Sequence, residues 1–144
     1  MQVSRKAVYA IKALIYVTAF KGKRLCTITE IAEKENIPRE YLAKILKELT
    51  QKGFLASYKG VKGGYRLAKP GTDISFMDIL EAVQDPLTLM ETSGDGKLYD
   101  GASYRFWADL LEALRGKLSK MTLGKIEYSK FYPGERAESK KQTK

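Results

Sequence analysis

The chain has 144 residues, a length that suits one modest domain with a core of its own. Lys and Arg number 26 against 17 Asp and Glu, so the net charge is +9 and suits a polyanionic partner. One cysteine excludes an internal disulfide, and without histidine, a phosphate loop or paired carboxylates we expect no enzyme activity. No apolar run approaches the ~18 residues of a membrane span and no signal-peptide pattern opens the chain. We therefore expect a cytoplasmic protein without a membrane partner.

The first predicted helix covers residues 4–21, with Ser4 as its N-cap. Its apolar face is expected to consist of Val8, Ile11, Leu14, Ile15, Val17 and Thr18. A turn then leads into a short β-like piece over residues 25–28. Cys26 lies in that piece, as a redox switch or as a small buried hydrophobe, and the second role is commoner for such a thiol.

The next stretch predicts a helix-turn-helix. A short helix begins with Thr29 as its expected N-cap, and Asn36-Ile37-Pro38 ends it because the residue before a proline is pushed out of the α region. Pro38 then suits the start of a second helix, and Gly53 suits the position just past its end. The apolar face of that second helix comprises Tyr41, Leu42, Ile45, Leu46 and Leu49. Its exposed face comprises Arg39, Glu40, Ala43, Lys44 and Lys47.

A basic hairpin follows the second helix. Residues 55–59 and 64–67 each suit a short strand, and the glycine-rich link 60–63 allows a tight loop that can approach a partner closely. Lys59 and Lys62 flank the loop, and Arg66 follows it. A helix-turn-helix that ends in such a hairpin is a winged helix, in which the second helix enters the major groove and the wing reaches backbone or minor groove.

The outward positions of the second helix suit base readout. Arg39 can hydrogen-bond a guanine edge, and Glu40 can accept a hydrogen bond from cytosine. Lys44 and Lys47 can reach bases or phosphates. A role at the helix N-terminus, paired with Lys44 one turn on, remains open for Glu40.

The charge is unevenly distributed along the chain. Residues 1–70 hold 15 basic and 5 acidic side chains, whereas residues 71–132 hold 7 basic and 10 acidic ones. A lysine-rich soluble surface would account for the excess alone. Its coincidence with the winged-helix pattern favours a phosphate-binding surface.

The last third of the chain predicts two further helices. Ser75 and Asp78 form a capping arrangement for a core helix with Ile74, Ile79, Leu80 and Val83 on its apolar side, which ends at Asp85-Pro86. After a loop, a long helix is expected over 103–121, with a short terminal helix over 122–132 and a disordered tail over 133–144. Near-heptad spacing on the long helix marks a seam of Trp107, Leu110, Leu111, Leu114, Leu118 and Met121. That seam either packs on its own domain or dimerises, and a completed winged helix before it favours dimerisation.

Five ordered blocks carry a family resemblance across residues 1–126. They are VSRKAVYAIKAL, ITEIAEKENIPREYLAKILKEL, YKGVKGGYRLAKP, ISFMDILEAVQDPLTLME, and FWADLLEAL with MTLGKI. The chain resembles the Rrf-two family of bacterial winged-helix regulators, which includes the iron–sulfur cluster regulator, the nitric-oxide-sensing repressor and the cysteine-metabolism repressor. The resemblance implies that the first helix places Ser4, Arg5 and Lys6 near DNA phosphates. It also implies that Tyr41 bonds a phosphate and that the long helix crosses its partner in a dimer.

The resemblance also locates a departure from the family. In cluster-binding relatives the loop matching residues 86–102 carries three cysteines, but here Thr92 stands where the first is expected, and no cysteine or histidine follows. Thiolates hold iron–sulfur clusters because soft, charged sulfur suits iron, and Thr, Ser and Asp cannot replace the set. We therefore expect no cofactor, no metal site and no cluster.

The resulting prediction is a mainly α fold. It comprises a winged-helix DNA-binding domain with a two-stranded β wing (1–85), the loop (86–102), and a C-terminal dimerisation helix with a short terminal helix (103–132). The expected DNA-binding residues are Ser4, Arg5, Lys6, Thr29, Pro38, Arg39, Glu40, Tyr41, Lys44, Lys47, Lys59, Lys62, Gly63 and Tyr65. We expect a homodimeric transcription regulator, by default a repressor, on a near-palindromic duplex, with a small molecule, a partner protein or Cys26 oxidation as signal. The alternative is a winged helix used for protein–protein contact.

Overall fold

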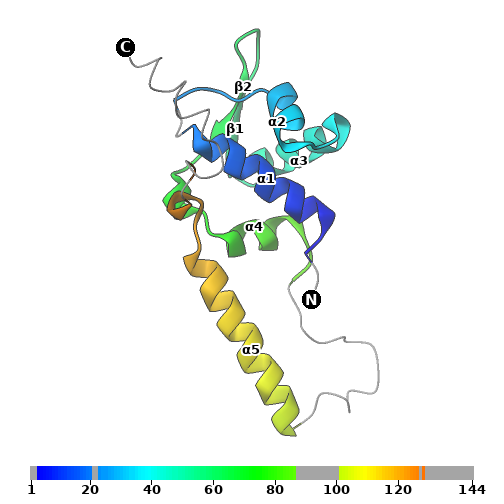
Figure 1. The fold of residues 1–144 in the computed structure, drawn as a ribbon, viewed down its shortest axis with the longest axis vertical. Helices are drawn as coiled ribbons and strands as arrows, with labels where there is room; N and C mark the ends of the chain where they lie inside the picture. The colour runs from blue at the N-terminus through cyan, green and yellow to red at the C-terminus, as the bar shows by residue number, and fades with distance from the viewer. Residues whose placement is uncertain (1–2, 21–22, 87–100, 127, 129–144) are drawn as a thin grey trace.

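The computed structural model describes residues 3–20, 23–86, 101–126 and 128, and its fold is mainly helical with one two-stranded antiparallel sheet (Figure 1). In chain order the elements are α1 (Arg5–Ala19), α2 (Ile28–Glu35), α3 (Arg39–Gln51), β1 (Leu55–Tyr58), β2 (Gly64–Leu67), η1 (Gly71–Asp73), α4 (Phe76–Val83), α5 (Gly101–Lys120) and η3 (Leu123–Lys125). Figure 1 shows α1 crossing the middle of a body formed with α2, α3, α4 and the hairpin, while α5 extends from it as a separate rod. The predicted fold class is confirmed.

Helix α1 is the central element of the body. The hydroxyl of Ser4 accepts a hydrogen bond from the Ala7 N–H at 3.0 Å, as expected of an N-cap. The predicted apolar face is wrong in part, because Val8 is exposed and Ile11 and Ile15 are only half-buried. The buried face comprises Ala7, Ala10, Ala13, Leu14, Tyr16, Val17 and Thr18. Small alanines let α1 lie close to α3 and α4, a packing that a count of large apolar residues misses.

The turn between α2 and α3 differs in its cap from the prediction. Thr27, and not Thr29, is the N-cap of α2: its side chain accepts from the Glu30 N–H, and the Glu30 carboxylate accepts from the Thr27 N–H. Asn36 ends α2 in the left-handed region at φ 54°. Pro38 lies at the N-cap of α3, one residue before the helix begins. Gly53, at φ 85°, takes the position past α3 that the sequence predicted.

The start of α4 and the end of α5 are joined by backbone hydrogen bonds. Ser75 and Asp78 form the expected capping box at the start of α4. The Phe76 N–H donates to the Met121 carbonyl at 2.8 Å, and the Leu123 N–H donates to the Ile74 carbonyl at 3.0 Å. The terminal helix predicted over 122–132 is instead the 3-10 turn η3 in its described part, Leu123–Lys125. The cluster-type loop at 87–100 and the tail at 129–144 lie outside the described residues.

Helix α5 begins at Gly101, two residues earlier than predicted, and ends at Lys120. It has no buried residue. In the described part of the chain, no helix combines the length and apolarity that crossing a membrane requires.

Candidate nucleic-acid interface

Helix α3 presents one buried and one exposed face. Leu42, Ile45 and Leu46 are at most 1% exposed and fix the helix on the body. Arg39, Glu40, Ala43, Lys44 and Lys47, the expected readout face, are all exposed. The first turn of α3 has no side-chain cap, so its N–H groups are available to an anion.

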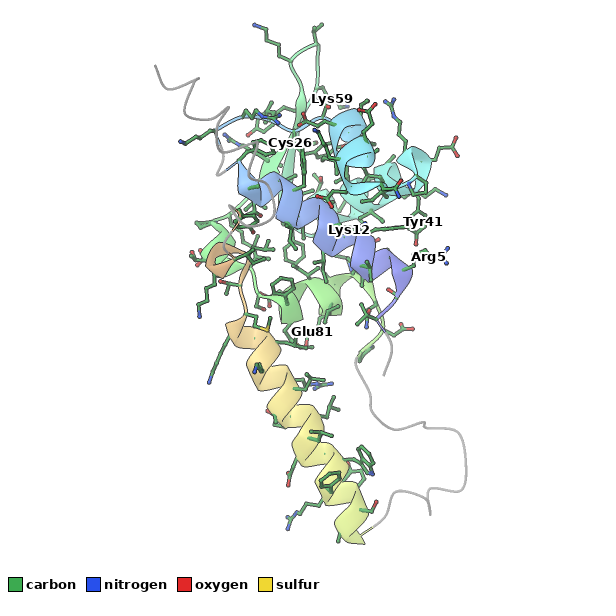
Figure 2. The ribbon with its side chains drawn as sticks, viewed as in Figure 1. Arg5, Lys12, Cys26, Tyr41, Lys59 and Glu81 are labelled. Carbon is green, nitrogen blue, oxygen red and sulfur yellow. The ribbon has the colours of Figure 1, made fainter. Side chains whose placement is uncertain are left out.

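Tyr41 lies where α3 meets α1. Its ring contacts the Tyr9 ring edge-on, with centroids 5.5 Å apart at 75°, yet the residue stays 37% exposed. This arrangement agrees with a ring that packs partly inward and leaves room for a second role. Figure 2 labels both Tyr41 and Arg5 toward the end of the body where α1 begins.

The start of α1 brings three predicted residues to that end of the body. Arg5 is exposed, whereas Ser4 and Lys6 are half-buried. The Lys6 ammonium lies 2.5 Å from the Glu48 carboxylate of α3, so part of its charge is neutralised within the protein. The Ser4 N–H donates to the side-chain carbonyl of Gln84 at 3.0 Å, which ties the start of α1 to the end of α4.

The wing depends on glycine at its link. A Cβ on Gly63 would lie 2.2 Å from the Tyr58 carbonyl oxygen, and one on Gly64 would lie 2.7 Å from the Cys26 carbonyl oxygen. Gly60 has φ 111°, a region that other residues rarely adopt. Lys59 and Lys62 are exposed on either side of the fully exposed Val61. Figure 2 shows Lys59 where the hairpin leaves the body.

Gly63, Tyr65 and Thr29 complete the predicted set, with different surroundings. Gly63 is half-buried and permits the tight turn. Tyr65 is half-buried against the core, and its backbone exchanges two hydrogen bonds with Cys26, at 2.8 and 2.9 Å. Thr29 is exposed on the first turn of α2. The predicted set therefore spans α1, α2, α3 and the wing.

Most cations of this surface form no ion pair with an acidic side chain of the described residues. Among the described residues the ion pairs are Lys6–Glu48, Arg24–Glu30 and Lys52–Glu48. The pair of Glu40 with Lys44, which the sequence left open, is not among them. The cations of the predicted set outside these pairs are Arg5, Arg39, Lys44, Lys47, Lys59 and Lys62. An exposed surface of unneutralised cations is what binding to a polyanion requires.

The donor groups of this chain do not fit an iron–sulfur cluster. Cys26 is fully buried at the bridge with Tyr65, and the sequence has neither a second cysteine nor a histidine. No group of three or more metal-ligating side chains occurs among the described residues. The β-like segment is an isolated bridge, and Cys26 occupies it as the small buried hydrophobe that the sequence favoured.

Sequence reasoning missed the cap at Thr27, although the signal was present. Thr27-Ile28-Thr29-Glu30 has the spacing of a capping box, with a hydroxyl residue three positions before a glutamate. The chosen Thr29 lacks an acidic partner at that spacing.

A helix-turn-helix followed by a two-stranded basic wing defines a winged-helix protein. The family model Rrf2, described as iron-dependent transcriptional regulator, matches residues 3–127. The chain therefore belongs to the Rrf2 family of transcriptional regulators. The resemblance predicted from the five sequence blocks is confirmed.

Individual relatives agree with this membership. Rv1287 of Mycobacterium tuberculosis (strain H37Rv), named as an HTH-type transcriptional regulator, is 32% identical over 88% of this chain and 81% of its own. The regulator IscR of Klebsiella pneumoniae is 28% identical over 88% of this chain and 79% of its own. CymR of Staphylococcus aureus is a solved structure with a TM-score of 0.72, 27% identity, and coverage of 84% of this chain and 93% of its own. CymR of B. subtilis shares the fold, with a TM-score of 0.75 at 24% identity over 85% of this chain and 93% of its own.

Proposed function

We propose that this Rrf2-family protein is a cytoplasmic homodimer that binds a near-palindromic DNA site and represses transcription by occluding a promoter. The observation that carries the proposal is the exposed face of α3 together with the wing, where Arg39, Lys44, Lys47, Lys59 and Lys62 form no ion pair among the described residues. Winged helices place such a second helix in the major groove and the wing beside it.

Exposed apolar side chains on α5 support a dimer. Tyr104, Phe106 and Leu110 are between 45% and 60% exposed, and Trp107 and Leu114 are only half-buried. Met121, the last residue of the predicted seam, lies one residue past the end of α5 and is 45% exposed. Leu111 and Leu118 pack in part on the protomer's own core, so only part of the predicted seam is used within one chain. A second copy of α5 would remove the remaining apolar surface from water.

A two-fold axis determines the form of the DNA site. The two identical winged-helix domains of the dimer would bind inverted half-sites whose centres lie one helical turn, or a multiple of a turn, apart. In each half-site Arg39 recognises a guanine edge, Glu40 accepts from cytosine, and Lys44 and Lys47 reach bases or phosphates. Ser4, Arg5 and Tyr41 contact phosphates beside the groove, and Lys6 contributes less because Glu48 neutralises it.

The signal acts without an iron–sulfur cluster in this proposal, because the donor set does not fit one. A small molecule or a partner protein is the favoured effector. Direct oxidation of Cys26 is disfavoured, since its thiol is buried and oxidation requires an accessible thiolate.

The first experiment is selection of bound duplexes from a random pool, with protein purified without oxygen and its absorption spectrum recorded. Enrichment of a palindrome by a colourless protein is the expected result. No enriched motif would favour the protein-binding winged helix, and a brown protein would contradict the absence of a cluster.

Two sets of variants distinguish phosphate contacts, which are independent of sequence, from base contacts, which determine sequence preference. Lys59→Ala with Lys62→Ala should weaken binding to all duplexes. It should also reduce the steepness with which the logarithm of the binding constant falls with the logarithm of salt concentration, here called the salt slope, by about 0.9 for each phosphate that is no longer neutralised. The matched control removes two exposed lysines of α5, Lys117→Ala with Lys120→Ala, and should leave the slope unchanged.

Arg39→Ala should relax preference at one position of each half-site, at a cost of about 1–3 kcal/mol on the preferred sequence. Arg105→Ala, an exposed arginine on α5, is its control. Equal losses for Arg39→Ala on selected and random duplexes would remove Arg39 from the readout set.

A further inference from the structure

The outward face of the wing carries an aromatic–cation pair. In the hairpin register Tyr58 is opposite Gly64, and Ala56 is opposite Arg66, so these four residues share one face of the two strands. Leu55 is on the other face and is 2% exposed, which identifies that face as inward. Because Gly64 has no side chain, nothing opposite Tyr58 covers its ring, and the diagonal neighbour Arg66 can reach it.

The Arg66 side chain lies over the uncovered Tyr58 ring. Its guanidinium carbon lies 4.9 Å from the centroid of the Tyr58 ring, within the range of a cation–π contact. Tyr58 is 42% exposed and Arg66 is exposed, so the pair stands at the surface. A guanidinium over a ring can still donate from its N–H groups to a bidentate acceptor such as a phosphate. No hydrogen bond or ion pair of the Arg66 guanidinium is present within the part of the chain that the structure describes.

The pair directs the charge of Arg66 toward the loop. The Arg66 backbone is in register with Ala56, but Tyr58 lies two residues nearer the link that carries Lys59 and Lys62. Residues 49–72 contain five basic side chains and no acidic one, so no carboxylate in this stretch competes for the guanidinium. The local positive charge and the N–H donors of Arg66 therefore complement a polyanion with paired acceptor oxygens, such as a phosphate backbone.

We propose that Arg66, held over the Tyr58 ring, binds a backbone phosphate of the DNA, as a third cationic contact of the wing beside Lys59 and Lys62. Tyr58 is the positioning residue, because it restricts the flexible arginine before DNA arrives and so lowers the entropy lost on binding. This inference rests on the proposed DNA-binding function. It adds a residue that spacing along the sequence did not select.

The experiment measures affinity for the selected duplex and for a random duplex over a salt series of about 50–200 mM, the range in which phosphate contacts dominate. Four full-length variants are compared with the wild type: Arg66→Ala, Arg66→Lys, Tyr58→Val and Tyr58→Phe. Thermal melting of each variant without DNA reports whether the wing change alters the fold. Tyr58→Val keeps a strand-favouring residue but removes the ring, and Tyr58→Phe keeps the ring as the matched control.

Arg66→Ala should lower the salt slope by about 0.9 per protomer and weaken both duplexes equally. Tyr58→Val should weaken binding about two- to fivefold with the slope retained, since the charge remains but is no longer held. Tyr58→Phe should match the wild type, and Arg66→Lys should keep the slope.

Three outcomes overturn the inference while the proposed function stands: a wild-type slope for Arg66→Ala, equal affinities for the two Tyr58 variants, or a melting temperature of Tyr58→Val below the assay temperature, which would assign the ring a structural role. If the wild type shows no salt-dependent binding to either duplex, both the inference and the proposed function fail.

Discussion

Helices α3 and α5 carry similar leucine-rich patterns, but their apolar side chains are buried to different extents. On α3 the apolar positions Leu42, Ile45, Leu46 and Leu49 are at most 1% exposed, whereas α5 has no buried residue over its 20 positions. Helical spacing predicts that one face of a helix is apolar, but it does not say which surface covers that face. The body covers the apolar face of α3, whereas no residue of α5 is buried within the single chain.

The largest effect is expected from a charge placed in the apolar face of α5, which tests whether that face is a dimer interface. Leu110→Lys puts two lysines into the proposed dimer interface, and each buried, unpaired ion costs several kcal/mol. We expect monomers by sedimentation and loss of specific DNA binding. Asp109→Lys introduces the same side chain at the neighbouring position on the polar side of α5 and should remain dimeric. A dimeric Leu110→Lys protein would remove this face from the interface.

The second test truncates a leucine in each region. Leu46→Ala in the body should lower the free energy of unfolding by about 2–5 kcal/mol, because it leaves a cavity in a closed core. In the proposed dimer, Leu114→Ala on α5 should instead raise the dissociation constant of the dimer, since its contacts would form between chains. Sedimentation at several protein concentrations measures that constant, and Leu46→Ala should leave it near the wild-type value while lowering the urea midpoint of unfolding. Equal dissociation constants for the two variants would argue against the distinction.

The wing differs from the core because its conformation requires glycine, a residue without a Cβ, at positions where the backbone has close neighbours. Gly63→Ala forces a Cβ onto the Tyr58 carbonyl oxygen, so the link must shift, at a cost of about 1–3 kcal/mol for such overpacking. We expect DNA affinity to fall about tenfold, which is the equivalent of 1.4 kcal/mol, as measured by anisotropy. Val61→Ala at the fully exposed tip is the control for the loop and should fold normally. Wild-type affinity for Gly63→Ala would show that the wing tolerates the shift.

The smallest effect is expected from replacing the glycine inside α5, which tests how closely a partner approaches that helix. Gly116 lies inside α5 with open space around the position of a Cβ. Gly116→Ala should stabilise the helix by about 0.5–1 kcal/mol, because alanine loses less backbone entropy than glycine. Circular dichroism during thermal unfolding would measure the gain, and sedimentation should show an unchanged dimer. A destabilised variant would indicate that the partner helix approaches closely at Gly116.

Local signals in the sequence predicted much of the body. The capping box of Ser75 and Asp78, the glycine after α3 and the two wing strands depend on neighbours within a few residues, and all three were predictable. The buried face of α1 was predicted only in part, because alanines become core residues only when other elements approach them.

The contacts of individual site residues were less predictable. The ion pair of Lys6 with Glu48 and the Arg66–Tyr58 contact join residues far apart or on different strands. Their existence depends on the fold, so no spacing rule along the chain reports them. Exposure of the α3 cations, in contrast, follows directly from helical periodicity.

The hydrogen bond from the Ser4 N–H to the Gln84 side chain joins residues 80 positions apart. Contacts of such long range form late in folding, because the intervening chain must first be ordered. During synthesis α1 leaves the ribosome first, but this tie at its first turn cannot form until residue 84 has followed. We therefore expect a nascent chain that stops short of α4 to lack this arrangement at the start of α1, where the exposed Arg5 lies.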